Sequence, residues 1–343
     1  MTALSILASG MVTSVGLDAA SSCAAIRCAI DNFSETKFVN RDGDWIIGAQ
    51  VPLQKSALGL ARLVYLVVPA IAECLAEAGV PAEEIPLLLC VAEKDRPGRP
   101  ADLDTQLIEN VQYELGVRFH PRSGVIARGR VGGALALRAA QVLIEEEGIP
   151  NCVVAGVDSL LVSGTLAAYE RKNRLLTPQN SNGFIPGEAG CAVLIGNAEE
   201  GAPCVLRCTG IGRATEQVTL DSEKPLRGDG LAQAIRSAFA DAGCGYEQID
   251  YRLSDANGEQ NWFKEAALAM TRTLRVRKEL FDIWHPADVV GETGAAIGPC
   301  VLGVALAAIL KNYAPGGGVL CHFGNDAGER LALILTGAVE AGR

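Results

Sequence analysis

The sequence predicts an α/β fold built from layers of strands and helices. Three observations predict this class. First, apolar runs with the length of buried strands alternate along the chain with longer segments of helical spacing. Second, 49% of the 343 residues are hydrophobic and only 20% are charged, so the chain can bury a large core. Third, 38 glycines with only 5% aromatic residues favour closely packed elements joined by tight turns.

The first part of the chain follows this alternation up to about residue 200. We expect strands at 4–10, 85–92, 151–155 and 191–195, and helices at 18–30, 57–79, 102–115 and 132–147. The run at 85–92 is apolar throughout, as a strand covered on both faces should be. Gly79 stands where a helix typically ends. Such alternation also favours parallel strands.

The second part repeats the plan from about Pro203. We expect strands at 204–210, 249–256, 318–322 and 331–336, and helices at 228–243, 261–273 and 298–310. No linker rich in proline or serine separates the two parts. The sequence therefore predicts two similar halves, 1–200 and 203–343, that form a duplicated unit.

Composition excludes several function classes. The net charge of −10, without a basic run, leaves little electrostatic attraction for nucleic acid. No stretch has the 18–20 uninterrupted apolar residues of a membrane span, and we interpret residues 1–16 as a first strand rather than a signal peptide. The 11 cysteines are scattered singly without a CxxC pair, so we expect no metal, no cofactor and a reducing cytoplasm.

Four segments carry a family resemblance. They are residues 8–16 (ASGMVTSVG), 153–159 (VVAGVDS), 174–190 (with RLLT and GFIPGEAG) and 291–298 (GETGAAIG). In this order they resemble the β-ketoacyl-[acyl-carrier-protein] synthase branch of the thiolase-like superfamily. The GFIPGEAG turn before an apolar strand is the most specific of the four. The resemblance spans nearly the whole chain, which is shorter than a typical member, and implies a thiolase-like fold with a five-layer αβαβα sandwich.

The resemblance implies a Cys-His-His set for condensation, and the cysteine position is changed. In the family, a cysteine at a helix N-terminus takes the acyl group because the helix dipole stabilises its thiolate. Counting back from the strand at 151–155 places this position at Arg130, and a slip of one residue would place it at Gly129 or Val131. The register does not alter the conclusion, because residues 124–148 contain no cysteine, serine or threonine.

Both histidine positions are changed as well. Asn257, within SDANGEQ (254–260), stands where the resemblance places the first histidine. Glu292 stands where it places the second, and Ala287 replaces the family lysine five residues earlier. The chain therefore resembles a degenerate member without the Cys-His-His set.

Other residues complete the candidate pocket implied by the resemblance. They are Arg128, Phe184, Glu188, Cys321, His322 and Phe323. Cys321 is close to the position of a second catalytic cysteine in thiolases, although a buried strand-end thiol is the simpler interpretation. His322 is the histidine nearest to an expected site, whereas His120 and His285 are expected in exposed loops without a catalytic role.

The replaced site has two interpretations. We expect Arg130 and Glu292 to form an ion pair that fills the former active site and excludes an acyl chain. The alternative is an anion site, in which Arg128, Arg130 and the free N–H groups at the helix start would bind a carboxylate or phosphate.

Three functions follow from these interpretations. The favoured one is a non-catalytic binding or scaffold protein, accessory to acyl synthases or serving as a chaperone or adaptor in a bacterial secretion effector system. The second is an acyltransferase or β-ketoacyl synthase-type enzyme with a non-standard site at Cys321, His322 or Asn257. The third is a sensor of a small anion. The resemblance also implies a homodimer, or a heterodimer with a related synthase, and a possible acyl carrier protein or other protein partner.

Overall fold

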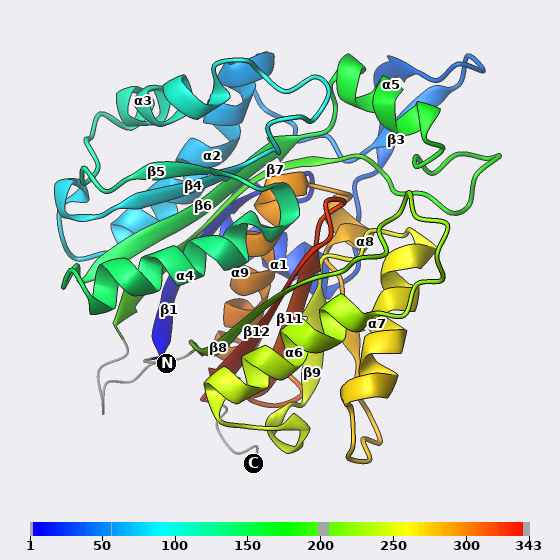
Figure 1. Cartoon of the computed structure of the whole chain (residues 1–343). Coiled ribbons are helices and arrows are strands. Elements are labelled where there is room, and N and C mark those ends of the chain that lie inside the picture. Colours follow the sequence, from blue (N-terminus) through cyan, green and yellow to red (C-terminus); the bar gives the residue numbers. More distant parts are fainter. Residues whose placement is uncertain (1–2, 56, 198–205, 339–343) are drawn as a thin grey trace.

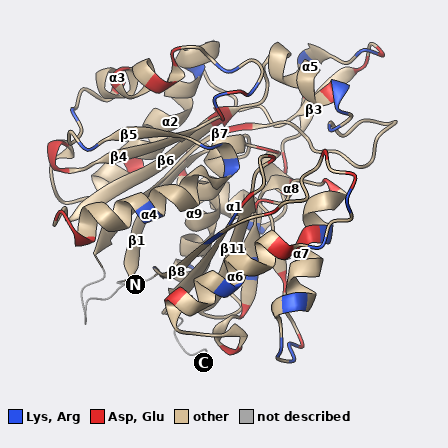
Figure 2. Ribbon diagram, viewed as in Figure 1, with Lys and Arg blue, Asp and Glu red and all other residues tan. Residues whose placement is uncertain are grey.

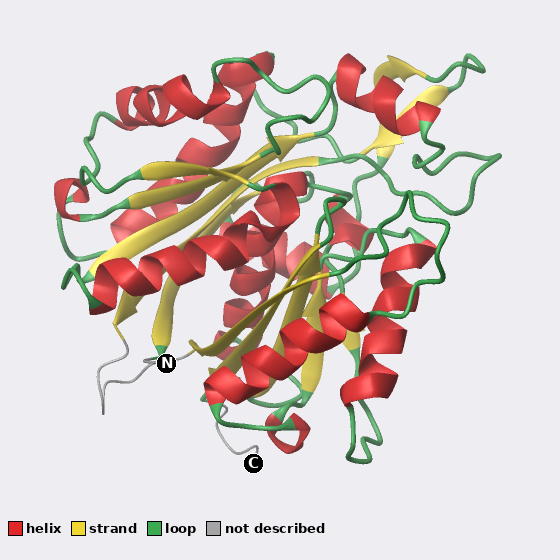
Figure 3. Ribbon diagram, in the orientation of Figure 1, coloured by secondary structure: helices red, strands yellow, loops and turns green. Residues whose placement is uncertain are grey.

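The computed structural model describes residues 3–55, 57–197 and 206–338, whose strands and helices form alternating layers (Figures 1 and 3). The first-half strands are β1 (Leu4–Val12), β4 (Leu87–Val91), β5 (Gly124–Ala127), β6 (Asn151–Ser159) and β7 (Glu188–Asn197). The second-half strands are β8 (Leu206–Thr215), β9 (Tyr251–Ser254), β10 (Ile283–Trp284), β11 (Gly318–Gly324) and β12 (Glu329–Gly337). A separate small sheet pairs β2 (Ser34–Val39) with β3 (Trp45–Gly48).

The helices occupy three layers around these strands (Figure 1). One outer layer consists of α2 (Gly59–Ala76) and α3 (Leu103–Leu115), and the other of α6 (Asp229–Ala242) and α7 (Gln260–Thr273). Between the strands of the two halves lie α4 (Gly132–Glu145) and α9 (Ile297–Leu310), with α1 (Ala19–Arg27) beside α9. The short helices are α5 (Ser163–Arg171) and α8 (Ala287–Val290). The predicted five-layer α/β architecture is confirmed.

The strand order repeats between the halves. The ten strands run β10-β9-β11-β12-β8-β1-β7-β6-β4-β5 across the sheet. If the five strands of each half are numbered in chain order, both halves place them side by side in the order first, fifth, fourth, second, third. The two halves meet where Leu4–Ile6 of β1 pairs with β8. This repeated order supports our proposal of a duplicated unit with halves at 1–200 and 203–343, although the boundary itself falls outside the described residues.

The expectation of parallel strands is wrong for five of the nine pairings in the ten-stranded sheet. β4 pairs in parallel with β5 and β6, and β9 pairs in parallel with β10 and β11. The pairings of β6 with β7 and of β11 with β12 are antiparallel. The pairings of β7 with β1, of β1 with β8 and of β8 with β12 are antiparallel as well. The last strand of each half runs back along its predecessor, and β12 does so after a turn of only four residues, too short for a parallel crossover.

Sequence periodicity found the long elements but not the short ones. The expected strands and helices named above correspond to observed elements with shifts at their ends, except that 204 and 205 lie outside the described residues. The small sheet, β5, α5, β10 and α8 were not predicted. Each of these elements has nine residues or fewer, although length alone does not explain the omission, since β4 and β9 are as short and were predicted.

α2 is long and apolar enough to cross a membrane by length and composition alone. In this fold it packs on β1, β6 and β7, and its residues Leu66, Val67, Ala70 and Ile71 are fully buried. Its apolar face is therefore explained by the protein core.

The two middle-layer helices bring distant parts of the sequence together. A Cβ atom at Gly133, near the start of α4, would lie only 2.9 Å from the Cα of Gly298, near the start of α9. Glycine at both positions lets the backbones approach this closely. The residues just before α4 and α9, among them Arg130 and Glu292, therefore face each other.

Candidate functional site

A sharp turn connects β5 to α4 at the expected nucleophile position. Gly129 has a φ of 55°, in the left-handed region that favours glycine. A Cβ atom at Gly129 would lie 1.9 Å from the carboxylate of Glu93, which follows β4. The space for a side chain at residue 129 is thus filled by Glu93, which sequence reasoning did not identify. Burial raises the pKa of Glu93.

Arg130 points into the protein between the two halves. Its Nε donates to the carbonyl oxygen of Gly324 at 2.9 Å, and its Nη1 donates to Oε2 of Glu292 at 3.1 Å. Asp255 lies 3.5 Å from Nε, and the guanidinium carbon is 4.0 Å from the centre of the Trp262 ring. Only 8% of the side chain is exposed. The predicted ion pair between Arg130 and Glu292 is therefore present.

The three residues that the sequence resemblance assigned to catalytic positions meet at one carboxylate. Oε2 of Glu292 accepts from Arg130 and also from Nδ2 of Asn257, at 2.5 Å. Oε1 of the same carboxylate accepts from the backbone N–H of Gly294 at 2.8 Å. Arg130, Asn257 and Glu292 come from three separate segments of the chain. The structure thus joins them in one hydrogen-bonded unit.

A second buried arginine extends this unit. Arg174 donates from Nε and Nη2 to the two oxygens of Glu259, both at 2.7 Å, and from Nη1 to Asp326 at 2.5 Å. Glu259 also accepts from Nε1 of Trp262 at 3.1 Å and from Asn257 at 3.3 Å. We call the joined set of Asp255, Asn257, Glu259, Glu292, Asp326, Arg130 and Arg174 the charge network.

The charge network changes the protonation properties of its members. Burial raises the pKa of Asp255 to about 6, although the guanidinium of Arg130 opposes the shift. Burial also acts to raise the pKa of Asp326, but the charges of Arg174 and Arg130 outweigh it and hold that pKa below its usual value. Buried charges of this kind persist only when each is paired and hydrogen-bonded.

Little free space remains around the charge network. The cavity next to Arg130, Arg174, Phe184, Glu292 and Asp326 has a volume of about 20 Å³. A second cavity, which Trp262 lines together with Asp255, His322 and Phe323, has a volume of about 10 Å³. Each holds at most about one water molecule, whereas sites for organic ligands measure roughly 300–1,000 Å³. Neither cavity can accommodate an acyl chain.

Two of the sequence-predicted residues lie apart from the charge network. Arg128 is 57% exposed, and its Nη1 is 3.5 Å from Glu329. Glu188 is fully buried at the start of β7, where it accepts from Arg62 of α2, from Ser159 and from the backbone N–H of Val51. Glu188 therefore connects α2 to β6 and β7. Phe184, by contrast, lines the cavity beside Glu292 and lies edge-on to Tyr169 at 5.0 Å.

The three predicted residues of β11 divide between its two faces. Cys321 is fully buried in the apolar core, and burial raises the pKa of its thiol well above the ordinary value. His322 points to the opposite face, as successive strand residues do, and burial lowers the pKa of its imidazole to about 3. Phe323 is buried in the same core as Cys321. His322 is thus poorly placed to activate Cys321.

Several members of the charge network were missed by sequence reasoning although they lie within or beside the family-like segments. Arg174 opens the segment RLLT, Asp255 and Glu259 lie in SDANGEQ, and Asp326 lies three residues after Phe323. Their charge was the available signal, because a condensing site has no need of so many ion pairs. Glu93 lies outside these segments and offered no such signal. The described residues contain no group of three or more potential ligands arranged for a metal ion.

Charge on the outer surface is mixed in sign. Figure 2 shows basic and acidic residues on both α6 and α7. Each cysteine within the described residues is a free thiol.

Comparison with known proteins indicates the type of fold. No family model matches the chain. It is 26% identical over 201 residues to a Streptomyces cyaneus protein described as polyketide beta-ketoacyl synthase 2, covering 54% of this chain and 48% of that one. The chain spans about half the length of the curated relatives it matches.

Solved structures resemble the chain over nearly its whole length. The ishigamide ketosynthase/chain length factor has a TM-score of 0.77 at 16% identity, covering 98% of this chain and 99% of that chain. A type II polyketide ketosynthase in complex with its acyl-carrier protein has a TM-score of 0.80 at 14% identity, covering 98% and 100%. The fold is thiolase-like, and the predicted resemblance to the β-ketoacyl synthase branch is confirmed.

Proposed function

We propose that this chain, whose fold and sequence resemble ketosynthases and their chain length factors, is a non-catalytic subunit that binds a protein partner. The observation that carries the proposal is the charge network. The resemblance assigns the catalytic positions to Arg130, Asn257 and Glu292. Arg130 and Asn257 both donate to Glu292, and the space beside them is too small for a substrate. Condensation needs a nucleophile to hold the acyl group and groups that stabilise the developing enolate. Arg130 has no nucleophilic atom, and Glu292 is an anion where a donor is needed.

The edge strand β5 is the surface that we propose for the partner. It ends the ten-stranded sheet, pairs only with β4 among the described strands, and consists of Gly124, Val125, Ile126 and Ala127. It contains no charged residue or proline, the usual protections of a free edge. Another thiolase-fold subunit would extend the sheet there. We propose that this subunit is either a second copy of the chain or a related synthase. We also propose that an acyl carrier protein would reach the pair.

A charge placed on β5 tests this surface. We expect Val125→Lys or Ile126→Lys to weaken subunit association at least tenfold, because a lysine would be desolvated at the pairing edge. Analytical ultracentrifugation of the purified chain, alone and with a related ketosynthase, measures this. The matched control is Leu280→Lys, since Leu280 is 81% exposed and lies after α7. Association that survives both β5 substitutions in folded protein would refute β5 as the interface.

The geometry favours this proposal over the two alternatives. An acyltransferase would need an activated nucleophile, but Cys321 is fully buried on the face opposite His322. An anion sensor would need an uncompensated positive charge, but Arg130 is paired with Glu292 and Asp255, and Arg128 lies near Glu329. An accessory subunit of an acyl synthase is also closer to the known relatives than a secretion adaptor is. We place the chain in the cytoplasm, where its free thiols would stay reduced.

A further inference from the structure

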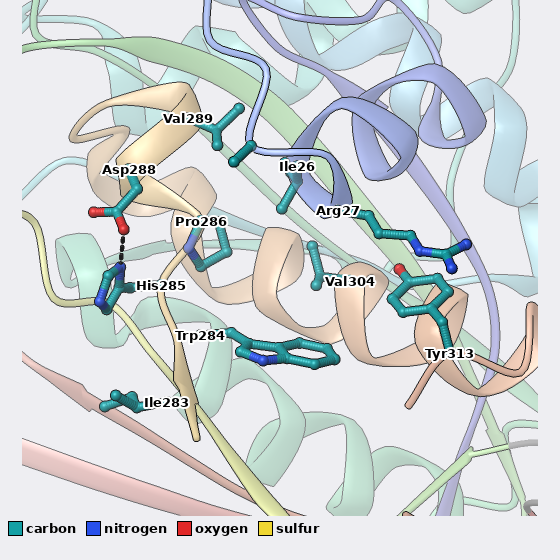
Figure 4. Close-up of a pocket in the computed structure, with 11 residues that line it drawn as sticks. Ile26, Arg27, Ile283, Trp284, His285, Pro286, Asp288, Val289, Val304 and Tyr313 are labelled. Carbon is teal, nitrogen blue, oxygen red and sulfur yellow. Dashed lines mark ion pairs between the residues drawn. The ribbon is translucent and has the colours of Figure 1, made fainter. Parts of the chain in front are cut away.

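A larger cavity lies outside the charge network and shares no lining residue with it. It has a volume of about 430 Å³ and lies between α1, β10, α8 and α9 (Figure 4). That volume is within the range of sites that bind small organic molecules.

The lining of this cavity is mostly apolar and aromatic. Ile26 of α1, Val289 of α8 and Val304 of α9 supply aliphatic surface, and the rings of Trp284 and Tyr313 lie below them in the view of Figure 4. The ring of Trp284 packs against the ring of Tyr251, and the two ring centres are 4.6 Å apart. The ring of Tyr313 stacks with the ring of Trp284, and the two ring centres are 6.2 Å apart. These ring contacts constrain the aromatic wall of the cavity.

The charged groups of the cavity leave one cation without a counterion. Nδ1 of His285 lies 2.6 Å from Asp288, and this hydrogen bond raises the pKa of His285, so Asp288 has a partner other than Arg27. His285 is 19% exposed and lines a cavity, so the expectation of an exposed loop histidine is corrected. The guanidinium carbon of Arg27 lies 4.3 Å from the centre of the Tyr313 ring, and Arg27 forms no ion pair within the described part of the chain. Because the ring contacts one face of the guanidinium, its N–H edges stay available to donate hydrogen bonds to an anion.

We propose that this cavity binds a small organic anion, in which a carboxylate pairs with Arg27 and an aromatic or branched apolar body packs on Trp284 and Val304. The inference is independent of the proposed function. A neighbouring cavity of about 540 Å³, which also contains Lys311, lies on the other side of the pair formed by Arg27 and Tyr313. Lys311 thus offers a matched control, because it is a cation of the adjoining cavity but not of this one.

Titration with 3-phenylpropionate and its uncharged amide, 3-phenylpropionamide, tests the proposal. We expect saturable binding of the acid, seen as a change in tryptophan fluorescence, and at least tenfold weaker binding of the amide. Arg27→Gln should weaken the acid at least tenfold and remove the preference over the amide, whereas Lys311→Gln should bind as the wild type does. Ile26→Trp should abolish binding by filling the cavity, and Trp284→Phe should remove the fluorescence change.

Three results would overturn the assignment. One is the lack of saturable binding by folded protein, and another is equal binding of acid and amide. The third is an Arg27→Gln variant that binds the acid like the wild type. If Arg27→Gln instead changes the sedimentation of the protein, the cavity is a contact between subunits and the small-molecule assignment is wrong.

Discussion

Replacing Arg130 by methionine is expected to lower the free energy of unfolding by about 3–5 kcal/mol, because it leaves buried carboxylates without their counterion. Glu292 would lose its ion pair and Asp255 its nearest cation. Chemical denaturation at pH 7.5 measures the change. Arg128→Met is the matched control, since Arg128 is two residues away and 57% exposed, and it should cost less than about 1 kcal/mol.

A second substitution separates the ion pair from general packing. In the double variant Arg130→Met/Glu292→Gln, the unpaired charge at residue 292 is removed, so part of the lost stability should return. A coupling energy of about 1–3 kcal/mol between the two sites is expected. Equal and small effects of Arg130→Met and Arg128→Met would show that the charge network does not hold the site together.

Replacing His322 by glutamine is expected to make the protein more resistant to acid. Burial lowers the pKa of His322 to about 3 in the folded protein, whereas in the unfolded chain the pKa is about 6.5. Between these values the unfolded state binds more protons, so His322 destabilises the fold as the pH falls below 6.5. At pH 4.5, two pH units lower, this cost is about 3 kcal/mol.

The measurement is the loss of unfolding free energy between pH 7.5 and 4.5 in the wild type and in His322→Gln. The loss should be smaller by about 3 kcal/mol in the variant. Asp255 has the opposite effect, because its raised pKa of about 6 favours the folded state as the pH falls. That contribution is common to both proteins and is removed by the comparison. Identical pH profiles would contradict the buried, neutral state of His322.

The sequence predicted the layered fold because its long elements carry strong patterns. The apolar runs at β4 and β6 and the helical spacing of α4 and α9 follow directly from burial. The direction of the returning strands β7 and β12 could not be read in this way, because an apolar run looks the same in parallel and antiparallel pairs.

The candidate site could be predicted only where the family resemblance supplied positions. Arg130, Asn257 and Glu292 were located by the motifs, and the structure joins them. Glu93 reaches the site from a loop with no motif, so only the fold reveals that its carboxylate fills the space beside Gly129. The separation of Cys321 from His322 follows from the alternation of successive residues along a strand, so the predicted strand at 318–322 already implied it.

We propose that the former condensing site is filled and cannot hold an acyl group. Intact-protein mass spectrometry after incubation with acyl-CoA and acyl-carrier thioesters tests it most directly, with an active ketosynthase as positive control. A Cys28→Ser/Cys244→Ser background removes the two described cysteines that are not buried, which could react non-specifically. We expect the folded protein to acquire no acyl adduct. A stoichiometric adduct that maps to one cysteine, Cys321 first among them, and is lost when that cysteine is replaced would contradict it.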